Sequence, residues 1–113
     1  MPHCLIEYAK TISTEVTPEQ LIGSVYLGAL NSGLFSADDI KTRIIPFDYF
    51  TSGVIKQNFI HVTLKILNGR TIEQQKALSQ SVLDELNLLP LDDISLTVDV
   101  VEIQKACYSK TVK

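Results

Sequence analysis

Residues 59–74 read FIHVTLKILNGRTIEQ and join a strand pattern directly to a helix start. Apolar side chains stand at every second position in the first half: Ile60, Val62, Leu64 and Ile66. This period of two is typical of a strand with one buried face. In the second half, Thr71 is followed three residues later by Gln74, the spacing of a helix capping box. The stretch therefore predicts a strand that leads into a helix.

The same helix start occurs earlier in the chain. Thr17 precedes a proline at the first helical position, and Gln20 follows three residues after Thr17. The two predicted helices run from Pro18 to about Asn31 and from Ile72 to about Asn87. The first is expected to end at Ser32-Gly33, because glycine suits a left-handed helix cap.

Strand-like runs flank both predicted helices. Cys4–Tyr8 precedes the first helix, and Ile40–Ile45 follows it and is expected to end at Pro46. After the second helix comes Leu96–Ile103, where Val100-Val101 interrupts the alternation and suggests a bulge. Residues 48–57, which include Gly53, are expected to form a connection or a hairpin between the halves.

The order of these elements predicts a single α+β domain over residues 1–113, built from two βαβ units. The units span about 3–47 and 58–104. Helical crossovers place the strands that they join in parallel, so we expect a four-stranded mixed sheet. Both helices are expected on one face of it. The other face then lacks a cover, which favours an oligomer.

Composition excludes several classes of protein. Of the 113 residues, 45% are hydrophobic and 20% are charged, an ordinary balance for a globular chain. The net charge of −3 and the absence of a basic tract argue against nucleic-acid binding. No stretch is apolar enough to predict a membrane span or a signal peptide, so we expect a cytoplasmic protein with Cys4 and Cys107 reduced. Neither cysteine nor histidine shows metal-ligand spacing, so no metal site is predicted.

Several segments, taken together, match the pattern of a known group of proteins. The chain opens on Met1-Pro2-His3 and continues into Ile6-Glu7. The other matching pieces are Gly33-Leu34-Phe35, Ile40-Lys41-Thr42-Arg43, Phe59–Ile66 and Gly69-Arg70-Thr71. With these segments the chain resembles the tautomerase superfamily, and within it the 5-carboxymethyl-2-hydroxymuconate isomerase family. The resemblance covers nearly the whole chain, and its most specific parts are the strand around His61 and the Gly-Arg-Thr step.

This resemblance implies a homotrimer whose subunits pack their sheets into a central barrel. It implies that Met1 is removed, so that Pro2 becomes the N-terminus. The implied reaction moves a proton between carbons of a dienol or unsaturated keto acid, without a cofactor. Members of the family often act in the breakdown of aromatic compounds.

The residues themselves suggest how such a reaction proceeds. A terminal proline is a rigid secondary amine, and burial or nearby cations lower the pKa of an amine. We therefore expect neutral Pro2 to act as the base that takes a proton from the substrate and returns it. Lys41 and Arg43 stand two apart on a predicted strand and thus share a face, where they would supply positive charge.

Three cations are the predicted binders of a small carboxylate substrate. By resemblance, the essential arginine of the family falls at Lys41, its other anchoring arginine at Arg70, and a further one at Arg43. Lysine keeps the charge but loses the bidentate grip on a carboxylate. The substrate therefore stays open between a 5-carboxymethyl-2-hydroxymuconate-like acid and another enol such as phenylpyruvate, and a non-catalytic carboxylate-binding protein is the third alternative. His61, on the polar face of its strand, is expected to contact a neighbouring subunit.

Overall fold

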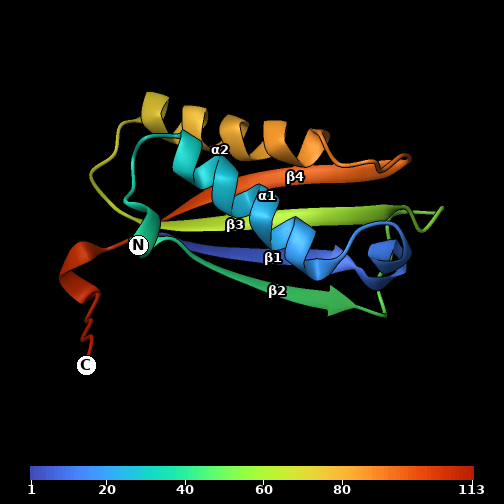
Figure 1. Ribbon diagram of the computed structural model, residues 1–113, viewed down its shortest axis with the longest axis horizontal. Helices are drawn as coiled ribbons and strands as arrows, with labels where there is room; N and C mark the ends of the chain where they lie inside the picture. The colour runs from blue at the N-terminus through green and yellow to red at the C-terminus, as the bar shows by residue number, and fades with distance from the viewer.

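The computed structural model describes all 113 residues and contains two strand–helix–strand units joined in one sheet (Figure 1). The principal elements are β1 (His3–Ala9), α1 (Pro18–Asn31), β2 (Lys41–Phe47), β3 (Asn58–Leu67), α2 (Ile72–Asn87) and β4 (Ile94–Ile103). Three short 3-10 helices cover Lys10–Thr14, Ala37–Asp39 and Lys105–Cys107. The predicted order of elements and both predicted helix spans are confirmed.

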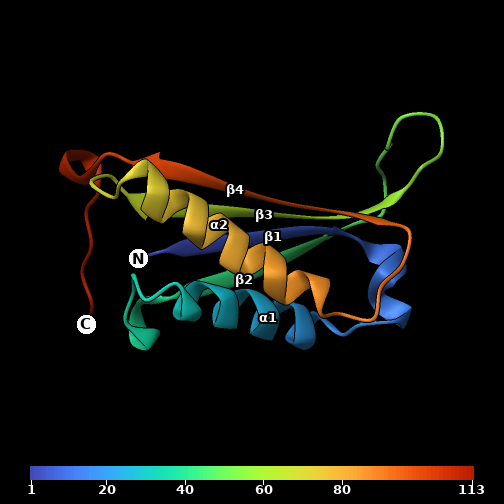
Figure 2. The same ribbon diagram turned by 90° about the horizontal axis from the view of Figure 1, so that it is seen from above.

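The sheet has the strand order β2-β1-β3-β4. Each helical crossover joins parallel strands, β1 with β2 and β3 with β4, while the central pair β1 and β3 is antiparallel. The sheet is therefore mixed, as predicted. Because β1 lies between β2 and β3, residues 48–57 form a connection that crosses one end of the sheet rather than a hairpin, and they project away from it (Figure 2).

Both helices cover the same face of the sheet (Figures 1 and 2). The inward side chains of β1 and β3 are fully or almost fully buried beneath them: Cys4, Ile6, Tyr8, Ile60, Val62, Leu64 and Ile66. Leu78, Val82 and Leu86 form the buried stripe of α2. The alternation in the sequence thus defines the core, and the opposite face of the sheet carries the alternate side chains without a layer above it.

The helix starts have the predicted hydrogen bonds. The hydroxyl of Thr17 accepts from the amide of Gln20, and the side chain of Gln20 accepts from the amide of Thr17. Thr71 and Gln74 repeat this exchange at the start of α2. After α1, Gly33 adopts a φ of 74°, the left-handed conformation that the Ser32-Gly33 pair suggested. No helix is long and apolar enough to cross a lipid bilayer.

Two local expectations were wrong. Pro46 does not end β2, which continues to Phe47, with Pro46 opposite Tyr8. Proline is tolerated there because β2 is an edge strand. Val100-Val101 does not form a bulge, since the register between β3 and β4 is continuous; Val101 lies on the open face and is 40% exposed.

The contact between α1 and α2 depends on a glycine. A Cβ atom added at Gly28 would lie 2.6 Å from the Cα of Val82, whereas one added at Gly23 in the same helix would meet nothing within 4 Å. We expect Gly28→Ala to lower the free energy of unfolding by about 1–3 kcal/mol through overpacking. Gly23→Ala is the matched control and should raise it by about 0.5–1 kcal/mol through helix propensity. Urea unfolding of both variants measures the contrast, and equal effects would contradict this close approach.

Candidate active site

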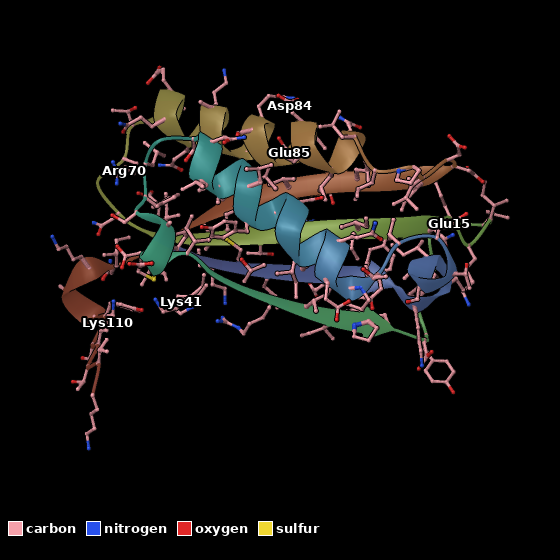
Figure 3. All side chains as sticks on the ribbon, in the orientation of Figure 1. Glu15, Lys41, Arg70, Asp84, Glu85 and Lys110 are labelled. Atoms are coloured by element: carbon pink, nitrogen blue, oxygen red, sulfur yellow. The ribbon has the colours of Figure 1, made fainter.

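One end of the sheet brings together segments that are far apart in the sequence. β1 and β2 begin at this end, and β3 and β4 finish there, so the first residues lie beside residues 33–40, the step into α2 and the C-terminal segment. Lys41, Arg70 and Lys110 all lie at this end, whereas Glu15 lies at the opposite end (Figure 3). The fold thus places cations from three segments around the start of the chain.

Pro2 lies just before β1 and is buried. Its carbonyl accepts a hydrogen bond of 3.0 Å from the amide of Lys41, which fixes it against the start of β2. By the alternation of the strand, Pro2 continues the inward face formed by Cys4 and Ile6, as predicted from the sequence. Burial raises the pKa of the Cys4 thiol to about 11, so this neighbour stays protonated at neutral pH.

The amine of Met1 and the side chain of Lys41 meet at one backbone oxygen. The Met1 nitrogen donates to the carbonyl of Asp39 at 3.2 Å, and Lys41 Nζ donates to the same carbonyl at 3.3 Å. Burial lowers the pKa of the Met1 amine, and the positive charges of Lys41 and Lys110 lower it further, against the opposing Asp39 carboxylate. Lys41 therefore acts on the start of the chain by its charge.

Arg70 lies at the turn between β3 and α2 and lines a cleft together with Met1. Its Nη2 atom donates to the carbonyl of Leu34 at 2.7 Å, and its guanidinium lies 5.8 Å from the ring centre of Phe35. Gln75 Nε2 donates to the Arg70 carbonyl at 3.1 Å and holds the turn. A guanidinium has five N–H donors, so most remain available for a carboxylate.

A cleft of about 220 Å³ lies between Arg70 and the N-terminus. Its lining includes Met1, Phe35, Ser36, Asp39, Leu67 and Arg70. The wall is partly apolar, with Arg70 as its cation. Such a cleft suits a small organic acid, because its carboxylate would meet the guanidinium while its carbon chain lies against the apolar wall.

Arg43 has a different partner from Lys41, although both point to the open face of the sheet. Its Nη1 atom lies 3.0 Å from His3 Nδ1, and Tyr108 Oη lies 3.0 Å from His3 Nε2. A guanidinium only donates, so Nδ1 accepts and the proton of neutral His3 is on Nε2. Neither Arg43 nor Lys41 lines a cleft beside Met1. Arg43 is linked to the N-terminal segment through His3, and Lys41 through the carbonyl of Asp39.

The pKa of His3 is lowered by burial and, next, by the charge of Arg43. The unfolded chain therefore takes up a proton at this residue before the folded chain does as the pH falls below about 6.5. We expect the free energy of unfolding to decrease as the pH is lowered through this range. The decrease should be smaller in His3→Gln. Urea unfolding at pH 8 and pH 5 measures the difference, and parallel losses in the two proteins would contradict it.

Some residues at this end could not be assigned from the sequence. Asp39 contributes through its backbone carbonyl, which carries no sequence signal. Tyr108 and Lys110 belong to a C-terminal segment without periodicity, and only the direction of β4 brings them back to the N-terminus. His61, by contrast, lies on the open face with Nδ1 2.7 Å from Thr97 Oγ1, away from both clefts, so its contact with another subunit stays a prediction. No group of three or more histidine, cysteine or acidic side chains is arranged to hold a metal ion.

The sequence matches the family described as 5-carboxymethyl-2-hydroxymuconate isomerase over residues 2–112. The chain belongs to this family. It is therefore an enzyme of the isomerase class, and the resemblance noted from its motifs is confirmed. No curated protein matches the chain in sequence.

Solved structures share the fold. A 5-carboxymethyl-2-hydroxymuconate delta-isomerase is similar with a TM-score of 0.80 at 13% identity, covering 100% of this chain and 89% of that chain. A 5-carboxymethyl-2-hydroxymuconate isomerase from Deinococcus radiodurans R1 gives a TM-score of 0.70 at 20% identity, with 99% and 90% covered. A fused 4-OT wild type symmetric trimer gives 0.74 at 17% identity, with 92% and 87% covered. These structures confirm the predicted arrangement of two helices on a four-stranded mixed sheet.

Proposed function

We propose that this member of the 5-carboxymethyl-2-hydroxymuconate isomerase family moves a proton within a small unsaturated keto or dienol carboxylate, without a cofactor. 5-Carboxymethyl-2-hydroxymuconate is the proposed substrate, following the name of the family. The observation that carries the proposal is the position of the N-terminus, which lies beside an Arg70 cleft and has a lowered amine pKa.

The base in this proposal is the Pro2 amine, freed by removal of Met1. An α-amine ordinarily titrates near 8. Burial and the charge of Lys41 lower the pKa of the Met1 amine, and the same two causes would lower that of a terminal Pro2 amine, because Pro2 is the more buried residue and its carbonyl bonds the amide of Lys41. A larger fraction of the amine is then neutral at pH 7 and ready to accept a proton.

The proposed reaction conserves atoms and electrons. Neutral Pro2 takes a proton from the substrate and becomes an ammonium, while the electron pair of the broken bond moves into the conjugated system. Negative charge collects on the carboxylate and carbonyl oxygens, where Arg70 and Lys41 stabilise it. The Pro2 ammonium then returns the proton to another carbon, which gives the isomer and restores the base.

Proton exchange tests this proposal. The enzyme is incubated with 5-carboxymethyl-2-hydroxymuconate in D₂O, and with phenylpyruvate in parallel, and deuterium in the product is followed by NMR. We expect deuterium at carbon from the first substrate. We also expect kcat/KM to rise with pH, with the midpoint of the rise below about pH 8, because the neutral amine is the active form. Exchange into phenylpyruvate alone would favour the alternative enol, and saturable binding without exchange would favour the non-catalytic alternative.

We also propose a homotrimer. One face of the sheet lacks a layer within the chain, and it carries His3, Arg43, His61 and Lys65. One similar solved structure is a symmetric trimer by its own description. Light scattering at micromolar concentration should give three times the chain mass of 12.6 kDa. A monomer mass would refute the trimer and leave the isomerase proposal to its own test.

A further inference from the structure

A second cleft, of about 460 Å³, also borders the N-terminus. It is lined by Met1, Asp39, Leu67, Lys105, Tyr108 and Lys110. The first three of these also line the Arg70 cleft, so the two clefts share a wall at the start of the chain. Removal of Met1 would take away part of this shared wall.

The second cleft carries positive charge that the chain does not neutralise by ion pairing. Lys105 and Lys110 come from the segment after β4, and neither forms an ion pair. The one ion pair of the structure joins Lys10 and Asp48 at the opposite end of the sheet. Asp39 is the single acidic residue in the lining. Two ammonium groups in a cleft with one carboxylate favour an anionic ligand.

Specific contacts hold this C-terminal segment in place. Tyr108 Oη lies 3.0 Å from His3 Nε2, and the two rings pack edge to face with centres 6.1 Å apart. The amide of Lys105 donates to Asn68 Oδ1 at 3.0 Å. These contacts hold the segment to β1 at Tyr108 and to the end of β3 at Lys105, and so keep the backbone that carries both lysines beside the N-terminus.

We propose that the C-terminal segment supplies a second anion subsite, in which Lys105 and Lys110 bind a carboxylate at the far end of a ligand whose near carboxylate is bound by Arg70. The proposal rests on the proposed function for the identity of the reacting group between the two subsites. Lys105 and Lys110 are then specificity-determining residues, and Tyr108 is a positioning residue that acts through its bond to His3.

Equilibrium binding tests the subsite without any turnover. Calorimetry compares saturated dicarboxylates from glutarate to suberate with hexanoate, a monocarboxylate, on the full chain. We expect the double variant Lys105→Gln/Lys110→Gln to weaken the tightest dicarboxylate about tenfold and hexanoate less than twofold, because two charge-assisted contacts are lost for one ligand only. Lys113→Gln is the matched control, since it removes the same charge from the same segment outside the cleft.

Any one of three results would contradict the proposal of a second anion subsite. They are no dicarboxylate binding by the unaltered protein, no difference between it and the double variant, or an equal loss in Lys113→Gln. The isomerase proposal fails in a different experiment. If it is wrong, no proton exchange is seen, while the contrast in dicarboxylate binding between the unaltered protein and the double variant remains.

Tyr108→Phe tests the positioning role. It removes the hydrogen bond to His3 but keeps the ring packing. We expect faster amide hydrogen exchange across residues 105–110 and about threefold weaker dicarboxylate binding, with hexanoate unaffected. If both amide hydrogen exchange and dicarboxylate binding are unchanged, Tyr108 does not position the lysines of the C-terminal segment.

Discussion

Replacing Pro2 with alanine is expected to lower kcat by about 10²-fold or more in protein that has lost Met1. Alanine leaves a primary amine at the same place, but it lacks the ring that fixes the direction of the nitrogen lone pair. Intramolecular proton transfer depends on that direction, because the donor carbon and the acceptor carbon must both come within reach of one nitrogen. Steady-state assays with 5-carboxymethyl-2-hydroxymuconate measure the loss.

The comparison is well matched, because both proline and alanine are small enough at position two to permit removal of methionine. Intact mass must show the same N-terminal processing in both proteins, and thermal unfolding must show that both are folded. An unchanged kcat in a correctly processed Pro2→Ala variant would show that the proline ring is not needed for catalysis. Such a result would leave the assignment of the chain to its family intact.

Replacing Arg70 with glutamine should lower kcat/KM by about 10²–10³-fold, the range seen when one charged or hydrogen-bonding stabiliser of an oxyanion is removed. The guanidinium is held by Leu34 and lies over Phe35, so it is pre-oriented toward the cleft. Arg70→Lys keeps the charge but loses the planar pair of donors. We expect it to recover only part of the loss.

Lys76→Gln in the exposed part of α2 is the charge-matched control and should leave kcat/KM within twofold, since Lys76 lines neither cleft. Because Arg70 also bonds the chain at Leu34, urea unfolding of all three variants separates lost catalysis from lost folding. Equal kcat/KM in Arg70→Gln and Lys76→Gln would place substrate binding away from this cleft.

Most of the fold could be predicted because local signals agreed with one another. The alternation through Ile60–Ile66 determines which face of β3 is buried, and two capping boxes mark where the helices begin. The two wrong expectations, a strand end at Pro46 and a bulge at Val100-Val101, came from rules for a single strand that ignore its place in the sheet. Pro46 is accommodated because β2 is an edge strand, and Val101 needs no bulge because the open face accepts a half-exposed apolar side chain.

The candidate site was harder to predict because it depends on side-chain direction. The register places both Lys41 and Arg43 on the open face, as their spacing indicated. From there Lys41 turns back to the carbonyl of Asp39, and Arg43 turns to His3. Strand periodicity gives the face but not the rotamer. The sequence therefore grouped two cations that the structure separates.

The most direct test of the account compares two forms of the same chain that differ only in Met1. One form is purified from cells with active methionine removal, and the other from cells in which removal is inhibited; intact mass identifies each. With Met1 attached, the Pro2 nitrogen is an amide and has no lone pair available for a proton. We predict that turnover of 5-carboxymethyl-2-hydroxymuconate follows the fraction of Met1-free protein and is at least about 10²-fold lower in the Met1-bearing form. Equal turnover in the two forms would contradict the central claim that the Pro2 amine is the base.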